Sequence, residues 1–187
     1  KKIPIMLGGE HLVTLGAICS AMQHYDDLCI IHFDAHADLR DEYIGDKFSH
    51  ATVMRRCHDL LGDDRIFQFG IRSGTREEFD FAENHTFCNR FNLDGLEHIR
   101  NIIADRPVYI TVDLDVLDPS VFPGTGTPEA GGVQFNELLH AVHSLQPLNI
   151  IAADICELSP PYDFSSVSVA AAIKILREFL LICLINK

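Results

Sequence analysis

LCIIHFDAHAD, residues 28–38, is the stretch that decides the fold. Its first six residues form an apolar run typical of a buried strand, and Asp34, His36 and Asp38 follow at alternating positions. Alternate side chains of an extended chain point to the same face. Two carboxylates and an imidazole at the end of a core strand are costly to bury without partners. A bound cation is the simplest partner, so this stretch predicts a metal site.

A second acidic pair follows another strand-like run. Residues 108–112 (VYITV) precede Asp113 and Asp115, which again alternate where a strand should end. A solvated turn leading into Asp118 would explain this pair alone about as well, because aspartate is common in turns. The repetition of the pattern after two separate buried strands favours the metal site.

Helix-like and strand-like segments alternate along the chain. Helical spacing of apolar residues occurs in six segments, 12–25, 49–61, 74–83, 93–104, 135–145 and 166–184. Short apolar runs typical of strands occur at 3–7, 28–33, 65–71, 108–112 and 149–155. This order predicts βαβ units in one domain, residues 1–187, with a three-layer α/β/α fold and a mostly parallel sheet. Ligands bind outside the carboxyl ends of strands in such sheets, which is where the acidic motifs fall.

Composition and charge exclude several classes of partner. The chain has 187 residues, 47% of them hydrophobic, and a formal net charge of -12. This acidic balance disfavours nucleic acid and anionic membranes and favours a small cationic ligand. No apolar run approaches the ~20 residues of a membrane helix. With no visible signal peptide and no C-x-x-C pair among the six cysteines, a cytoplasmic protein with reduced, buried thiols is expected.

Six residues at three strand ends offer metal ligands. They are four carboxylates and two imidazoles, namely His11, Asp34, His36, Asp38, Asp113 and Asp115. Four clustered carboxylates would raise one another's pKa if no cations lay between them. The set is too large for one small cation and suits two, and its oxygen-rich mix favours manganese. Two ions about 3.5–4 Å apart would supply a hydroxide that can hydrolyse C–N or P–O bonds.

Four motifs in the same order resemble the signatures of the ureohydrolase (arginase/agmatinase) family. They are residues 8–11 (GGEH), residues 34–38 (DAHAD) with Ser49-His50, residues 113–119 (DLDVLDP) with 124–132, and residues 154–160 (DICELSP). The resemblance spans essentially the whole chain and is strongest to the agmatinase branch. It implies an arginase-like fold that lacks the N-terminal part of the family domain, because family members normally begin further upstream.

The resemblance also implies roles for individual residues. Two manganese ions per subunit would be bridged by Asp34 and Asp113, and the other four candidates would be terminal ligands. His50 would move protons, and Glu157 would pair with the guanidinium of the substrate. The implied reaction is hydrolysis of agmatine to putrescine and urea in polyamine biosynthesis. Family members of this kind are expected to be trimers or hexamers.

The tail of the substrate depends on the segment that follows the DAHAD motif. Residues 39–48 lack the Ser/Thr/Asn-rich composition that arginases carry at this place. Asp41 and Glu42 favour a second positive group, as in agmatine, whereas Arg40 favours a carboxylate, as in guanidinobutyrate. Guanidinobutyrase, arginase and formimidoylglutamase are therefore alternatives. A catalytically inactive metal-binding fragment is the alternative outside enzymes.

Taken singly, several of these residues have simpler interpretations. His11 and His50 also fit ordinary helix starts, and Glu157 also fits a solvated loop. Their positions within the family motifs favour the functional interpretation. No function is predicted for the remaining surface histidines of the helices, which include His24, His58, His85, His98, His140 and His143.

Overall fold

The computed structural model describes residues 2–185. Within this range six strands pair side by side in a parallel sheet of order β1-β6-β5-β2-β3-β4. The strands are β1 (Ile5–Leu7), β2 (Cys29–Phe33), β3 (Ile66–Ile71), β4 (Phe87–Arg90), β5 (Pro107–Asp113) and β6 (Asn149–Cys156). Residues 1, 186 and 187, which the single-domain prediction includes, lie outside the described residues.

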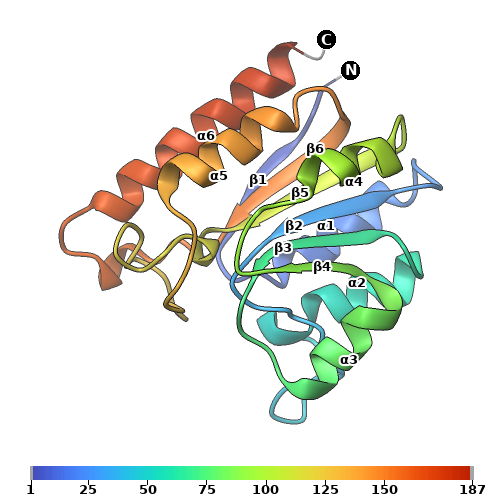
Figure 1. Cartoon of the computed structure of the whole chain (residues 1–187), viewed down its shortest axis with the longest axis horizontal. Helices are drawn as coiled ribbons and strands as arrows, with labels where there is room; N and C mark the ends of the chain where they lie inside the picture. The colour runs from blue at the N-terminus through green and yellow to red at the C-terminus, as the bar shows by residue number, and fades with distance from the viewer. Residues whose placement is uncertain (1, 186–187) are drawn as a thin grey trace.

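Helices cover both faces of the sheet (Figure 1). One layer contains α1 (Val13–Ala21), α2 (Val53–Leu61) and α3 (Arg76–His85), whose apolar side chains share a core with Ile30 of β2. The other layer contains α4 (Leu96–Ile103), α5 (Phe135–Ser144) and α6 (Val167–Ile185), which share a second core with Ile31. The predicted three-layer α/β/α architecture is confirmed. In the described part of the chain, no helix is both long and apolar enough to cross a membrane.

Strand β2 lies inside the sheet because neither face of the strand has the run of polar side chains that exposure to water would require. Every residue from Cys29 to Phe33 is buried, and consecutive side chains enter opposite helical layers. Parallel sheets covered on both faces select such continuous apolar strands. His32 is the one polar side chain in the run, and it is fully buried.

The strand register brings the ends of four strands to one edge of the sheet. Phe33 of β2 pairs with Val112 of β5, and Val112 pairs with Ile155 of β6. Ile155 in turn pairs with Leu7 of β1. The polar motif that follows each strand therefore starts at the same level. The predicted meeting of these motifs at the carboxyl edge follows directly from this register.

Strand β4 (Phe87–Arg90) is absent from the sequence-based prediction. It is an edge strand with half-buried and exposed side chains, so its four residues show neither a continuous apolar run nor a strict alternation. The prediction of uniformly buried cysteines is wrong for Cys19, which is exposed. Helix α3 starts at Arg76, two residues later than expected, because the Thr75 hydroxyl accepts a hydrogen bond from the Glu78 amide and caps it there.

Arg72 holds the irregular segment 115–133 against the sheet. Its guanidinium donates hydrogen bonds of 2.8–3.4 Å to the backbone carbonyl oxygens of Gly70, Asp115, Val116, Leu117 and Glu129. Only a rigid, planar, five-donor group can serve so many acceptors from one position. Arg72 therefore fixes the backbone on which the second acidic pair lies.

We expect Arg72→Met to lower the free energy of unfolding by about 2–3 kcal/mol, because buried carbonyl groups lose charged donors. Arg76→Met is the matched control. That side chain is 89% exposed and pairs with Asp80 at 3.6 Å on the surface, so a change within about 0.5 kcal/mol is expected. Urea unfolding of the metal-free proteins measures both values. Equal effects of the two substitutions would show that Arg72 does not hold the segment.

Candidate metal centre

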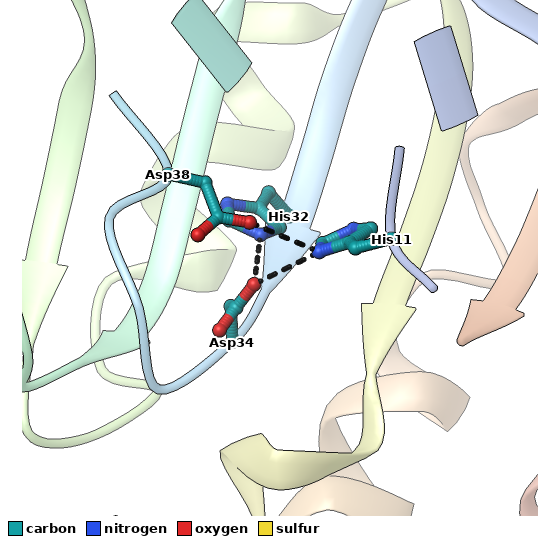
Figure 2. A group of neighbouring side chains, drawn as sticks. All are labelled: His11, His32, Asp34 and Asp38. Atoms are coloured by element: carbon teal, nitrogen blue, oxygen red, sulfur yellow. Dashed lines mark hydrogen bonds and ion pairs between the residues drawn. The ribbon is translucent and has the colours of Figure 1, made fainter. Parts of the chain in front are cut away.

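Three carboxylates surround one nitrogen of a buried imidazole. His11 follows β1, and its Nδ1 lies 3.1 Å from Asp34 Oδ2, 3.2 Å from Asp38 Oδ2 and 3.4 Å from Asp113 Oδ2. All four side chains are buried. Figure 2 shows Asp34 and Asp38, both from the segment after β2, converging with His11 from a separate segment of the chain. The structure thus brings together four of the residues that the sequence predicts as ligands.

The other two predicted ligands lie on the far side of Asp34. Nδ1 of His36 is 3.0 Å from Asp115 Oδ2 and 3.4 Å from Asp34 Oδ1. Asp34 therefore presents one oxygen to the His11 group and the other oxygen to the His36 group. This arrangement has the form expected of a carboxylate shared between two cations. The bridging role of Asp113 stays a prediction, since its Oδ1 accepts the Asp115 amide hydrogen at 2.8 Å.

A chain of hydrogen bonds defines which His11 nitrogen is free. The Thr111 hydroxyl donates to Asp154 Oδ1 at 2.6 Å, so its oxygen is left to accept from His11 Nε2 at 2.9 Å. In the neutral ring, Nδ1 then carries a lone pair. This buried Nδ1 has no hydrogen-bond partner and faces three carboxylates. Such an orphaned acceptor among anions fits a cation, which would bind all of these groups at once.

The pKa values of the cluster describe the same excess of negative charge. Burial alone would lower the pKa of His36, but Asp115 and Asp34 raise it to about 12. Burial and the charge of Asp34 raise the pKa of Asp38 to about 7. Burial and the neighbouring charges of Asp115 and Asp34 raise the pKa of Asp113 well above its usual value. Ionisation of all four carboxylates therefore requires added positive charge, which protons or divalent cations supply.

His32 belongs to the centre although the sequence reasoning assigned it no role. Its Nε2 lies 2.7 Å from Asp34 Oδ2 (Figure 2), and the Gln68 amide donates to its Nδ1 at 3.1 Å. Nε2 must then carry the hydrogen and donate to Asp34. His32 therefore orients this carboxylate and has no lone pair left for a metal. The available signal was an imidazole inside the otherwise apolar run of residues 28–33.

Backbone amides of the DAHAD motif hold the carboxylates in place. The His36 amide donates to Asp34 Oδ1 at 2.6 Å, and the Ala35 amide donates to Asp115 Oδ1 at 3.1 Å. Asp38 has φ of 56°, a left-handed conformation that aspartate tolerates better than most residues. This turn brings Asp38 back toward His11, which an extended chain would not do. The backbone conformation of the motif therefore directs the Asp34 and Asp38 carboxylates toward the same place, beside His11.

An open pocket of about 210 Å³ lies over the His36 side of the cluster. His36 and Asp38 form part of its wall, and His50 lies in the wall as well. The His50 ring is 43% exposed and packs edge-on against Tyr43, with 5.3 Å between ring centroids. Its Nδ1 is 3.6 Å from Glu10 Oε1. The predicted proton-transfer residue is therefore beside the cluster, within reach of solvent.

Glu157 lies against the His11 side of the cluster. Its Oε1 accepts the His11 backbone amide hydrogen at 2.7 Å, and its own amide donates to the Gly9 carbonyl at 2.9 Å. Its φ is 64°, so the chain turns sharply after β6 at this residue. Burial raises the pKa of Glu157. Its second carboxylate oxygen makes no hydrogen bond that the described residues provide, and a ligand could use it.

The three predicted tail-binding residues are placed differently from one another. Arg40 lines the pocket, where its Nε donates to Glu78 Oε2 at 3.3 Å and its guanidinium lies over the Tyr43 ring. Asp41 accepts a hydrogen bond from Arg56 Nη2 at 2.8 Å. Asp41 and Glu42 line a neighbouring surface depression, which shares Arg40 with the pocket. The structure therefore brings Arg40, but neither acidic residue, to the wall of the pocket.

Comparison with known proteins places this arrangement in a family. The sequence model of the Arginase family matches residues 1–182. The chain belongs to the arginase family. The agmatinase of Bacillus subtilis (strain 168) is 46% identical over 184 residues, which cover 96% of this chain and 63% of that protein. The guanidinobutyrase of Pseudomonas aeruginosa is 34% identical over 190 residues, covering 95% of this chain and 60% of that protein.

Solved structures of the arginase family have the same fold. A crystal structure from Clostridium difficile, described as a candidate agmatinase, superposes with a TM-score of 0.95 at 53% identity, covering 97% of this chain and 67% of that one. The agmatine ureohydrolase of Thermoplasma volcanium superposes with a TM-score of 0.82 at 37% identity, covering 97% and 62%. The predicted arginase-like fold is confirmed. The chain spans 60–63% of the length of the two curated relatives named above.

Proposed function

We propose that the chain carries the catalytic centre of an agmatinase, a manganese-dependent hydrolase that converts agmatine and water to putrescine and urea. The observation that carries the proposal is Asp34, which turns one oxygen toward His11 and the other toward His36 beside an open pocket. The agmatinase of Bacillus subtilis, at 46% identity, supports the choice of reaction. A small cationic guanidine is also the kind of ligand that a chain of net charge -12 would attract.

The six predicted ligands form two groups that would hold one ion each. His11, Asp38 and Asp113 make the first group, and Asp34 is shared with a second group. The second group adds His36 and Asp115. Oxygen donors outnumber nitrogen donors, which favours manganese. When bound, such a pair supplies a hydroxide nucleophile at neutral pH.

The residues around the cluster would manage the substrate and its protons. The leaving amine must gain a proton, and His50 can deliver one because its ring lines the pocket and is reached by water. The second oxygen of Glu157 lies beside the His11 group, where it can accept an N–H of the guanidinium. Because the Glu157 backbone is locked to Gly9, this acceptor is held in place before the substrate arrives.

A guanidinobutyrase is the second candidate, and Arg40 is the observation that favours it. Its guanidinium lines the pocket and could meet a substrate carboxylate. However, Glu78 already accepts a hydrogen bond from it, which offsets its charge. The identity to the Pseudomonas aeruginosa guanidinobutyrase is also lower, at 34% against 46% for the agmatinase. The hydrogen bond from Arg40 to Glu78 and the higher identity to the agmatinase both favour agmatine as the substrate.

Release of urea from the guanidine substrates, and of formamide from formiminoglutamate, tests the proposal. The manganese-loaded chain is offered agmatine, arginine, guanidinobutyrate and formiminoglutamate at equal concentrations. We expect the highest kcat/KM for agmatine. Turnover of guanidinobutyrate with no turnover of agmatine would contradict the substrate assignment and support the second candidate. Bound manganese with neither urea nor formamide from any substrate would identify a metal-binding fragment without activity. The trimer or hexamer and the cytoplasmic location stay predictions.

A further inference from the structure

A second group of side chains of metal-ligand type lies at the amino end of strand β3. His58 is in the last turn of α2, His85 ends α3, and Asp63 is in the turn between α2 and β3. His58 Nε2 lies 2.8 Å from Asp63 Oδ1, and His85 Nδ1 lies 2.7 Å from the same oxygen. Strand β3 begins three residues after Asp63, so this group marks the amino end of the strand. The metal centre described above, formed by His11, the DAHAD motif, Asp113 and Asp115 and called the principal centre below, follows the carboxyl ends of the strands.

Both imidazole rings are held by the same aromatic side chain. Phe81 stacks on His85 with 4.3 Å between centroids and an interplanar angle of 30°. The His58 ring meets Phe81 edge-on at 4.8 Å and 87°. The Arg55 guanidinium also lies over the Phe81 ring, 4.0 Å from its centroid. The two rings are therefore oriented by packing as well as by Asp63.

The turn that carries Asp63 is tied to both helices. The Gly62 amide donates to the His58 carbonyl at 2.8 Å, and the Asp64 amide donates to the His85 carbonyl at 3.3 Å. Gly62 and Asp64, on either side of Asp63, have positive φ of 81° and 59°. These bonds fix the carboxylate between the two rings. The conformational entropy of bringing the three side chains together is therefore already lost when the chain folds. An ion that binds them does not have to order the backbone.

The electrostatic surroundings favour a cation at this place. The C-terminal turns of α2 and α3 meet here, and helix C-termini carry partial negative charge. The side-chain hydrogen bonds from His58 and His85 lower the pKa of Asp63, which keeps its carboxylate ionised. Asp63 is 59% exposed and His85 is 37% exposed, so an ion can enter from solvent. The positive charge of Arg55 is placed over the Phe81 ring and lies 3.7 Å from Asp59 Oδ1.

We propose that His58, Asp63 and His85 form a binding site for a divalent transition metal, with Zn²⁺ as the preferred ion. The three ligand atoms already lie within 4.8 Å of one another. Two imidazole nitrogens and one carboxylate oxygen suit zinc, whose fourth tetrahedral position would be taken by water. The nitrogen-rich set contrasts with the oxygen-rich principal centre, so the two sites should prefer different metals.

Binding requires only a change of tautomer at each ring. In the structure both ring nitrogens donate toward Asp63 Oδ1. A neutral imidazole can carry its hydrogen on either nitrogen, so His58 would move it to Nδ1 and His85 to Nε2. The freed lone pairs and the ionised Asp63 then face the ion.

The pair His143–Glu178 shows what an ordinary surface contact of these residue types looks like. His143 Nε2 lies 2.9 Å from Glu178 Oε2. Lys174 and Arg177 also pair with that carboxylate, so cationic side chains already compensate its charge. A single imidazole beside a neutralised carboxylate is a poor metal site. This pair therefore supplies the matched control.

Zinc stoichiometry tests the site, with His85→Gln and Asp63→Asn as the two test variants and His143→Gln as the control. All four proteins are dialysed against the same buffered free Zn²⁺, and bound zinc is measured by mass spectrometry. The principal centre is unaltered in each protein and contributes equally. We expect the parent and His143→Gln to bind one Zn²⁺ per chain more than either test variant. Equal zinc in all four proteins would overturn the proposal.

Imidazole NMR of the parent protein gives an independent measurement. On addition of Zn²⁺, the ring nitrogens of His58 and His85 should exchange tautomer, with His58 Nε2 and His85 Nδ1 becoming the metal-bound atoms. The His143 nitrogens should stay unchanged. Unaltered His58 and His85 resonances at saturating zinc would overturn the proposal even if a test variant failed to fold.

Discussion

Asp115→Asn is expected to bind well below two Mn²⁺ per chain, with an affinity at least about 10–100-fold weaker than that of the parent. Asp115 Oδ2 lies 3.0 Å from His36 Nδ1, and its Oδ1 accepts the Ala35 amide. An asparagine keeps the shape and one acceptor but loses the anionic oxygen that would face the ion. It also introduces an N–H donor into a site built for a cation. Elemental analysis after dialysis against Mn²⁺ measures the loss.

Asp118→Asn is the matched control for this prediction. Asp118 lies three residues further along the same segment, and its carboxylate accepts the backbone amides of Ser120, Gly131 and Gly132. The substitution makes the same change in charge away from the cluster. Its manganese content should equal that of the parent. An Asp115→Asn protein with unchanged stoichiometry would remove Asp115 from the metal centre.

His50→Ala is expected to keep its manganese and to lower kcat by roughly 10²–10⁴-fold, the usual contribution of a general acid or base. Manganese content and kcat are expected to respond differently because His50 lies in the pocket wall and its Nδ1 pairs with Glu10, outside the six-residue cluster. Its loss removes a proton carrier and leaves the ligands in place. Steady-state urea release and manganese content, measured on the same preparation, test both halves of the prediction.

His143→Ala is the control for this substitution, because that ring is on the surface of α5 and pairs with Glu178. It should keep both activity and metal. Full activity of His50→Ala would show that His50 has no role in proton transfer. Loss of metal from His50→Ala would show instead that the ring is a ligand or supports one.

The sequence predicts which side chains meet at the carboxyl edge of the sheet, because the candidate ligands directly follow strand ends. A continuous apolar run such as residues 28–33 has few structural uses other than a buried strand, so the position of Asp34 at its end follows. Parallel pairing then brings Asp113 to the same edge through the register of Phe33 with Val112. The family motifs add His11, which lies far away along the chain. Each step rests on backbone geometry that a local pattern can specify.

The residues that sequence reasoning missed depend on contacts that no local pattern encodes. The role of His32 arises from Gln68 on a neighbouring strand, which fixes its tautomer. Asp41 is a plausible substrate ligand by charge, but the structure pairs it with Arg56 of α2. His58 and His85 belong to different helices, and only the packing of α2 beside α3 brings them to Asp63. Tertiary contacts decide each of these cases.

Anomalous diffraction at the manganese absorption edge, from crystals of the chain grown with Mn²⁺, tests the central claim most directly. We expect two peaks per chain, about 3.5–4 Å apart. One peak should lie beside His11 Nδ1 and the other beside His36 Nδ1, on opposite sides of the Asp34 carboxylate. A single peak, or two peaks that do not share Asp34, would contradict the two-metal centre.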